Sequence, residues 1–456
     1  MRQVRYPSYK TTKSTWLASI PEHWEEKRLK DVATYNDESL DEKTDPDFEI
    51  EYVDISSVSL THGIEKTELL AFEKAPSRAR RKVRHGDVIV STVRTYLKAI
   101  APIKNPPLNM VVSTGFAVIR PRSSLDARFA GYMLQSNGFV GDVVANSVGV
   151  SYPAINASDL ARLPFAEPPL PEQIRISDFL DHKTAQIDAL IAKKQSLLDK
   201  LAEQRTALIS QAVTKGLDPS VPMRNSGVDW VGEIPAHWTV PILGYVAEVR
   251  GGVTKGRKLP NEATVEVPYL RVANVQDGFI DLSHVTNIEI LVTELERYSL
   301  QKGDVLMNEG GDNDKLGRGA VWEGEISPCL HQNHVFAVRP RIPEFSDWLA
   351  LLTQSGYAKF YFYTTAKQST NLASISSSNI KKLPVLLPPE AERREIIDHV
   401  KTSLDKLTKQ RERVIQVIER LKEYRSALIT NAVTGKIDVR DFCILTTSEQ
   451  REVAHG

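Results

Sequence analysis

The chain has 456 residues, 41% of them apolar and 25% charged, a composition that is typical of globular proteins and excludes a collagen-like or low-complexity chain. Its length predicts about three domains' worth of structure at roughly 150 residues per domain, and its 58 basic and 58 acidic residues leave no net charge. No run of about 20 apolar residues occurs, and no apolar signal-peptide core precedes Lys13, so we expect a cytoplasmic protein without membrane spans. Neither Cys329 nor Cys443 lies in a CxxC pair, so we expect no disulfides and no cysteine zinc site.

The sequence contains two diverged copies of one unit. Residues 14–24 end in Ile-Pro-Glu-His-Trp, and residues 228–238, at an offset of 214, end in Ile-Pro-Ala-His-Trp. The offset grows to 217 between Gly86-Asp-Val and Gly303-Asp-Val, and from Ile155 onward it is constant at 220. A repeat that keeps its frame while most side chains of its middle part differ indicates two modules with one architecture and two different targets.

Each copy is expected to consist of a mixed domain followed by a long helix. Runs of β-type residues bounded by glycine, proline and charged residues occur at 88–90, 116–119 and 335–338. The predicted fold class is α+β, with two mixed α/β domains joined by two long helices that form an antiparallel coiled coil, and with a pseudo-twofold internal repeat. In chain order the predicted segments are a first mixed domain (1–165), a first spacer helix (166–217), a second mixed domain (218–385), a second spacer helix (386–438) and a C-terminal tail (439–456).

Apolar residues recur every seven positions in two rows along each predicted helix. In the first helix Lys194 interrupts one row and Arg205 the other. Sustained heptads with charged flanks predict a coiled coil, and Pro171, Gly216 and Gly435 suit the helix ends. Each helix would have about 45 residues, or roughly 65–70 Å at 1.5 Å per residue; burial in a globular core is the alternative. The residues expected to pack between the helices are Leu180, Ile187, Ile191, Leu198, Leu201, Leu208, Val400, Leu407, Val414, Ile418, Leu421 and Leu428.

These motifs together resemble a known family. Ile-Pro-x-His-Trp at a domain start, Leu-Pro before Pro-Pro, a long helix beginning near Glu172-Gln173 and an ending Ala-Val-Thr-x-Gly, most of them in both copies, are similar to the specificity subunits of type I restriction-modification systems. The resemblance covers nearly the whole chain. The second helix start departs from the pattern, because Glu392 keeps the glutamate while Arg393 replaces the glutamine, so we expect a different contact there.

The resemblance implies a sequence-specific DNA-binding subunit with two target-recognition domains. Each domain would read one half of a bipartite, asymmetric site on double-stranded DNA, and the helices would set the gap between the halves and dock methylation subunits, two of them by expectation. The methylation subunits would supply S-adenosylmethionine chemistry, and separate restriction subunits would supply ATP- and magnesium-dependent translocation and cleavage. This chain would then hold no cofactor or metal and carry no catalytic residue.

Charge is segregated along the first mixed domain. The segment from Arg78 to Lys104 contains eight basic residues and one acidic residue, and the segment from Asp37 to Asp54 contains nine acidic residues and one lysine. Such a basic run predicts either a solvated loop or a surface that neutralises DNA phosphates. The candidates for DNA contact in this domain are Arg78, Arg80, Arg81, Lys82, Arg84, Arg94, Tyr96, Lys98 and Tyr152; Arg80, Arg81 and Arg84 are hereafter the central arginines.

The second mixed domain contains a glycine-rich basic segment at 250–258. It lacks the GxxxxGK[ST] spacing of a phosphate-binding loop, which leaves a flexible turn or a loop that contacts DNA phosphates. Arginine can also read guanine, and asparagine or glutamine can read adenine, in the major groove. The candidates in this domain are Arg250, Thr254, Lys255, Arg257, Lys258, Arg271, Asn274, Asn308, Lys315, Arg318, Lys367, Gln368 and Asn371.

Two further functions have to be weighed. Asn105-Pro-Pro-Leu108 resembles the Asn-Pro-Pro-aromatic motif of adenine methyltransferases, but leucine cannot stack on a flipped base and no glycine-rich cofactor loop is evident, so a turn is predicted. A methyltransferase or nuclease with its own recognition domains remains the second hypothesis, and a coiled-coil adaptor without a DNA role is the third.

His23 and His237, beside the repeated tryptophans, are interpreted as packing or capping residues.

Overall fold

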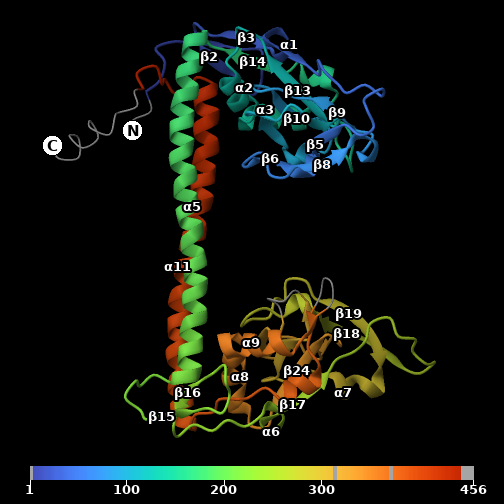
Figure 1. Cartoon of the computed structure of the whole chain (residues 1–456), viewed down its shortest axis with the longest axis vertical. Coiled ribbons are helices and arrows are strands. Elements are labelled where there is room, and N and C mark those ends of the chain that lie inside the picture. Colours follow the sequence, from blue (N-terminus) through green and yellow to red (C-terminus); the bar gives the residue numbers. More distant parts are fainter. Residues whose placement is uncertain (1–3, 312–315, 369–372, 443–456) are drawn as a thin grey trace, which may run out of the picture. The chain divides into compact units, whose positions relative to one another are not determined.

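A computed structural model describes residues 4–311, 316–368 and 373–442 of the chain (Figure 1). The chain divides into two compact units, Met1–Lys194 with Gln416–Gly456, and Gln195–Ile415. Each unit therefore contains one mixed domain and one half of each long helix. In the described part of the chain, no helix is both long enough and apolar enough to cross a membrane.

The first mixed domain is built from short strands in several small sheets. Two four-stranded sheets have the orders β11-β10-β13-β4 and β8-β5-β12-β9, and β14 pairs with β3 at the entry to the long helix. The strands are β1 (Tyr9–Thr11), β2 (Ser19–Pro21), β3 (Glu25–Arg28), β4 (Ala33–Tyr35), β5 (Glu49–Val53), β6 (Val58–Ser59), β7 (Gly63–Ile64), β8 (Glu68–Ala71), β9 (Ala79–Lys82), β10 (Val88–Ser91), β11 (Ile100–Pro102), β12 (Met110–Ser113), β13 (Phe116–Pro121) and β14 (Pro164–Glu167). The helices are α1 (Leu29–Val32), α2 (Ala127–Leu134), α3 (Asn137–Ala145) and α4 (Ala157–Leu160), with short 3-10 turns that include η3 (Thr95–Leu97).

The central strand β10 explains how this domain forms two cores. All four of its residues are buried, and successive side chains point to opposite faces of the sheet. Val88 and Val90 join the core that includes the long helices, whereas Ile89 joins a second core on the other face. A strand covered on both faces reads as an unbroken apolar run, which is why the run 88–90 was recognisable in the sequence.

The second mixed domain repeats this architecture. Its main sheet has the order β17-β24-β20-β22, which matches β4-β13-β10-β11 of the first domain strand for strand. The strands are β15 (Met223–Asn225), β16 (Glu233–Pro235), β17 (Ala247–Gly251), β18 (Thr264–Leu270), β19 (Thr286–Leu291), β20 (Val305–Asn308), β21 (Gly310–Gly311), β22 (Gly319–Val321), β23 (Leu330–His331), β24 (Val335–Pro340), β25 (Lys367–Gln368) and β26 (Ala373–Ser374). The helices are α6 (Leu243–Val246), α7 (Leu295–Tyr298), α8 (Ser346–Gln354), α9 (Gly356–Thr365) and α10 (Ser377–Lys381).

The two long helices are α5 (Leu170–Lys215) and α11 (Glu390–Val433), inside the predicted segments 166–217 and 386–438. Gly216 and Gly435 follow their last turns with φ of +73° and +71°. A left-handed residue at this position favours glycine and ends a helix, as the sequence predicted.

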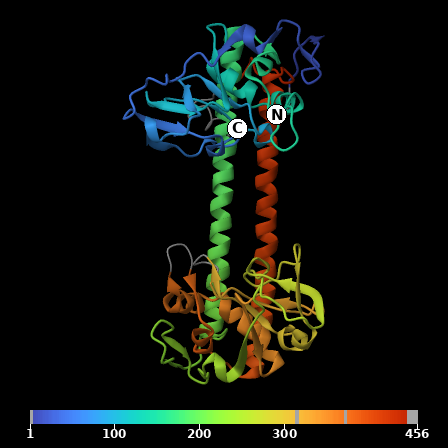
Figure 2. The same ribbon diagram turned by 90° about the vertical axis from the view of Figure 1, so that its right-hand side faces the viewer.

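Each unit pairs opposite halves of the two helices. In unit 1 the start of α5 packs with the end of α11, and the two lie side by side in both views (Figure 2). In unit 2 the end of α5 packs with the start of α11. This pairing is antiparallel. Of the residues predicted to pack, Leu180, Ile187, Leu201, Val400, Ile418 and Leu428 are buried, and Ile191, Leu198, Leu208, Leu407, Val414 and Leu421 are partly buried.

Candidate nucleic-acid interface

The repeated His-Trp motif fixes each mixed domain to the start of its long helix. In unit 1 the Glu172 carboxylate accepts hydrogen bonds from the Trp24 indole (3.1 Å) and the Tyr6 hydroxyl (2.6 Å), and lies 2.8 Å from Nε2 of His23. Burial, and the hydrogen bond to Glu172, raise the pKa of Tyr6. The motif therefore orients the domain on the helix, and the histidine is a contact residue of the glutamate.

The second unit repeats this contact and changes the residue beside it. Glu392 accepts the Trp238 indole (3.1 Å) and lies 2.7 Å from Nε2 of His237. In unit 1 the buried Gln173 accepts the backbone N–H of Asp126 (2.8 Å), but the aligned Arg393 lies over the Phe345 ring at 4.3 Å. The predicted difference between the two helix starts is confirmed.

The first loop pair, residues 92–98 and 146–156, brings four predicted DNA contacts together. The two loops are joined by hydrogen bonds from Ile155 N to Thr92 O (2.9 Å) and from Thr95 N to Pro153 O (3.3 Å), and by the hydroxyls of Thr95 and Ser147 (2.8 Å). The four residues are exposed at the surface of this pair: Arg94, Tyr96, Lys98 and Tyr152.

Exposed apolar side chains on the same loops were not recognised from the sequence. The side chains of Val148 and Val150 are 81% and 101% exposed, and Leu97 is 44% exposed. Exposed apolar groups that gather at one place indicate a contact surface. The available signal was the absence of charged residues between Asp142 and Asp159, which does not by itself distinguish an interface from a plain loop.

The second loop pair contains β21 in one loop and β25 and β26 in the other, and it occupies the position in the second domain that is aligned with the first loop pair. β26 pairs with β21 on one side and with β25 on the other, so it lies between Gly310-Gly311 and the exposed Lys367 and Gln368. The Arg318 side chain donates to Gln276 Oε1 (3.3 Å). Two predicted DNA contacts of this region, Lys315 and Asn371, lie outside the described residues.

The basic run 78–84 is not a free cationic patch. Arg78 forms an ion pair with Asp54 (2.7 Å), and Arg84 forms one with Glu38 (2.5 Å), so the acidic stretch folds against the basic run. Arg80 lies over the Phe72 ring at 4.6 Å. Burial lowers the pKa of Arg81, while Lys82 is exposed. Arg78 and Arg84 are therefore paired within the domain, and the DNA contacts of this run stay a prediction.

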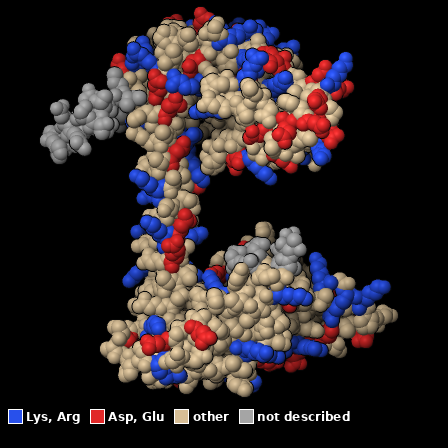
Figure 3. Space-filling model, viewed as in Figure 1, with Lys and Arg blue, Asp and Glu red and all other residues tan. Residues whose placement is uncertain are grey.

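The glycine-rich segment of the second domain is partly engaged in the same way. Both terminal nitrogens of Arg257 contact the Glu294 carboxylate, and these hydrogen bonds raise the pKa of Arg257. Arg250 donates to the backbone oxygen of Arg297 (2.7 Å). Figure 3 shows basic side chains gathered on this part of unit 2, around β18, β19 and α7. The exposed candidates of the segment are Thr254, Lys255 and Lys258.

Two predicted base-reading asparagines are structural. Asn274 is 3% exposed; it accepts the backbone N–H of Arg271 and donates to the carbonyls of Asp281 and His284. Asn308 is 1% exposed and donates to the Val275 carbonyl (3.1 Å). These amides satisfy backbone groups inside the domain, so their predicted role in reading DNA is corrected. Arg271 is half-buried, and its buried Nε has no hydrogen-bond partner among the described residues.

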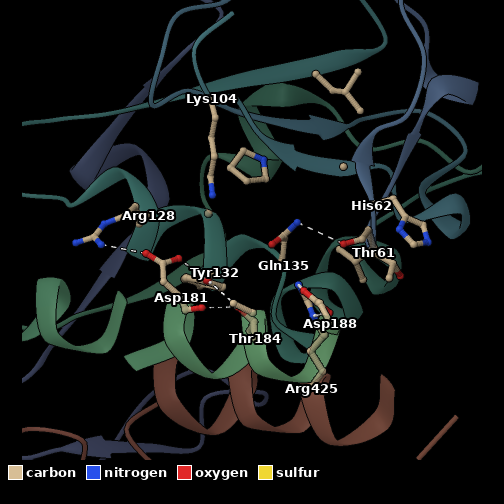
Figure 4. A pocket seen from close by; sticks show the side chains of 16 residues that line it. Thr61, His62, Lys104, Arg128, Tyr132, Gln135, Asp181, Thr184, Asp188 and Arg425 are labelled. Carbon is tan, nitrogen blue, oxygen red and sulfur yellow. Dashed lines mark hydrogen bonds and ion pairs between the residues drawn. The ribbon is translucent and has the colours of Figure 1, made fainter. Parts of the chain in front are cut away.

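A groove of about 490 Å³ separates the first domain from the helices within unit 1 (Figure 4). Arg128 and Tyr132 of α2 point toward Asp181 of α5, at 3.0 Å and 2.7 Å. In unit 2 the aligned residues carry reversed charges, with Lys401 of α11 paired to Asp347 of α8 at 2.7 Å. These contacts thus fasten each domain to a helix. Nowhere among the described residues do three His, Cys, Asp or Glu side chains converge as a metal site.

The molecule is therefore a duplicated recognition protein, with two mixed domains that expose different side chains from the same loops and two helices that connect them. The family model described as the type I restriction modification DNA specificity domain matches it twice, at residues 21–199 and 235–420. The two matches cover well over half of the chain, so the chain belongs to this family. It is a DNA-recognition subunit that works in a type I restriction-modification complex with other subunits.

Similar proteins agree with this membership. The specificity subunit of the type I restriction enzyme EcoKI from Escherichia coli K12 is 24% identical over 81% of this chain and 79% of its own length. A specificity subunit of the enzyme StySPI from Salmonella potsdam is 22% identical over 81% and 79%. A solved structure from a study of assembly and conformational transition in the type I system has a TM-score of 0.68 and 24% identity, covering 91% of this chain and 98% of that chain, which shows the shared fold.

Proposed function

We propose that each mixed domain reads one half of a bipartite, asymmetric DNA site through its own loop pair. The observation that carries this proposal is the combination of one retained frame with two different surfaces. The frame consists of the matching sheet orders and the two glutamate contacts at the helix starts. The surfaces differ because the first loop pair exposes Arg94 and Tyr152, whereas the second exposes Lys367 and Gln368.

We further propose that the helices set the gap between the half-sites and dock two methylation subunits. A continuous helix of 46 residues supports this, because it is about 69 Å long at 1.5 Å per residue and has no break at which its length could vary. The methylation subunits would bind S-adenosylmethionine, and the restriction subunits would bind ATP and magnesium. This chain would catalyse no step itself.

The test of modular reading exchanges one domain at a time. Residues 14–164 are replaced by the equivalent domain of another specificity subunit, and the methylated site is mapped in cells that also express the matching methylation subunit. The expected result is a change in one half of the site only. The reciprocal exchange of residues 228–384 is the control and should change the other half only. An exchange that altered both halves would contradict the proposal.

The alternative, a chain that methylates DNA itself, has its own test. Its one sequence motif starts at Asn105 and ends at Leu108, which lies fully exposed in a proline-rich turn. We expect that the purified chain transfers no methyl group from S-adenosylmethionine to DNA, and that Asn105→Ala leaves methylation by the assembled complex unchanged. Turnover by the pure chain that disappears in the Asn105→Ala variant would establish the alternative.

A further inference from the structure

Arg94 differs from the arginines of the first domain that pair with an acid. Arg78, Arg84 and Arg120 each form an ion pair with a carboxylate of the same domain, at 2.7, 2.5 and 2.8 Å. In the part of the chain that the structure describes, Arg94 forms no such pair; its guanidinium lies over the ring of Tyr152, 5.0 Å from the ring centre. An arginine stacked on an aromatic face keeps all of its N–H donors at the edge of the guanidinium plane available for another partner.

The backbone around Arg94 is fixed by contacts that are unusual for a plain surface loop. Arg94 and Lys98 flank the turn η3 in the left-handed region, at φ of +50° and +53°. A residue with a Cβ adopts this conformation at a cost, and it persists only where the surroundings enforce it. Here Ala154 bridges both to Val93 of the facing loop and to Val148 of its own loop, so the two loops form one small sheet-like support.

The side chains around Arg94 suit the major groove better than a phosphate. A phosphate is contacted equally well by a mobile cation on a polar surface, but Arg94 lies on a surface with exposed valines and tyrosines. Apolar groups contact the thymine methyl group, and a pre-oriented guanidinium donates two hydrogen bonds to O6 and N7 of guanine, the commonest specific contact to a base. Tyr152 would orient the guanidinium, and Val148 and Val150 would lie against neighbouring bases.

We propose that Arg94, positioned by Tyr152, is the guanine-reading residue of the first recognition domain. This assignment rests on the proposed function. It concerns one half-site only, because the second domain has Gly311 at the position aligned with Arg94 by the offset of 217.

The test maps methylated bases in cells that express the chain with the methylation subunit of its own system. The wild-type site is expected to have a G·C pair in the half that the exchange of residues 14–164 identifies as the first. In the Arg94→Ala variant that position should become degenerate, while every other position stays unchanged. In competition between duplexes that differ only there, the preference for G·C should fall by about tenfold or more. Tyr152→Phe keeps the ring and should keep the site, whereas Tyr152→Ala should relax the same position.

Two further variants separate base reading from other roles. Arg94→Lys keeps the charge and loses the two-pronged donor, so it should also relax the position. Arg84→Ala, the matched control, should leave the sequence of the site intact. In Arg94→Ala and Arg94→Lys, methylation could instead be lost uniformly at all sites while the sequence of the site stays intact. That result would make Arg94 a phosphate contact and overturn the assignment. A first half-site without G·C would overturn it as well. A wild-type complex that methylates no two-part site would instead refute the proposed function, before any substitution is made.

Discussion

Removal of the Glu172 carboxylate should destabilise unit 1 more than removal of Glu392 destabilises unit 2. In unit 1 two buried donors depend on the carboxylate, the Trp24 indole and the Tyr6 hydroxyl, which are 0% and 4% exposed as residues. A buried donor left without a partner costs about 1–3 kcal/mol. Glu172→Ala should therefore lower the stability of unit 1 by about 2–6 kcal/mol.

The second copy provides the matched control for this prediction. Glu392 is bonded by one buried donor, the Trp238 indole, and its side chain is 26% exposed, against 7% for Glu172. Glu392→Ala should then cost unit 2 about 1–3 kcal/mol. Native-state hydrogen exchange on the full chain, resolved by peptide, measures the opening free energy of each unit separately.

The double variant with Tyr6→Phe isolates the cause. Tyr6→Phe removes one of the two orphaned donors, so adding it to Glu172→Ala should recover about 1–3 kcal/mol of the stability. Equal losses of stability in the two units, or no recovery in the double variant, would refute the account based on buried donors.

Four further predictions follow from the charges and helices. Replacing the central arginines by alanine should weaken DNA binding by the complex, and should lower the slope of log K against log salt by about one for each phosphate that is no longer neutralised; an unchanged slope would assign them wholly to internal contacts. Arg128→Asp should loosen the first domain by roughly 0.2–1 kcal/mol, and adding Asp181→Lys should restore it, as judged by a double-mutant cycle. Burial lowers the pKa of His331 to about 4; because the unfolded chain then binds the proton more readily, unit 2 should lose stability as pH falls from about 6.5 to about 4, and urea titrations of His331→Asn should lack this component. Four residues inserted near Leu198 should lengthen the gap in the DNA site by one or two base pairs, read by methylation mapping.

The frame of this molecule could be predicted from its sequence because the frame is periodic and repeated. Heptads located both helices, and the constant offset of 220 aligned their ends. Gly216 and Gly435 marked the helix ends because a left-handed residue there needs no Cβ. Helix positions and helix ends depend on a few neighbouring residues, so they can be predicted from one sequence.

The partners of the charged and amide side chains could not be predicted in the same way. Arg84 and its acid Glu38 are 46 residues apart, and only the fold brings them together. Asn308 was predicted to read a base because an asparagine amide can hydrogen-bond to adenine. It lies instead at the end of a strand whose four residues are all buried. Long-range pairing decides which cations remain free for DNA.

The charge-reversed contacts show how two copies of one frame can diverge and still keep it. Arg128 pairs with Asp181 in unit 1, and the aligned Asp347 pairs with Lys401 in unit 2. A mismatched pairing of the two copies would place like charges together, which disfavours it. Each domain therefore matches its own helix segment, while the loop pairs vary independently of it.

The insertion near Leu198 tests whether the length of the helices sets the gap in the DNA site independently of the half-site sequences. Four residues add about 6 Å of helix, close to two base-pair rises of 3.4 Å. They rotate the following helix by about 400°, only 40° more than a full turn, so the apolar row stays nearly in line. A two-residue insertion rotates it by about 200° and should abolish assembly. If the helices act as the spacer, the longer variant keeps both half-site sequences and widens only the gap. A four-residue variant that methylates DNA with an unchanged gap would exclude that role.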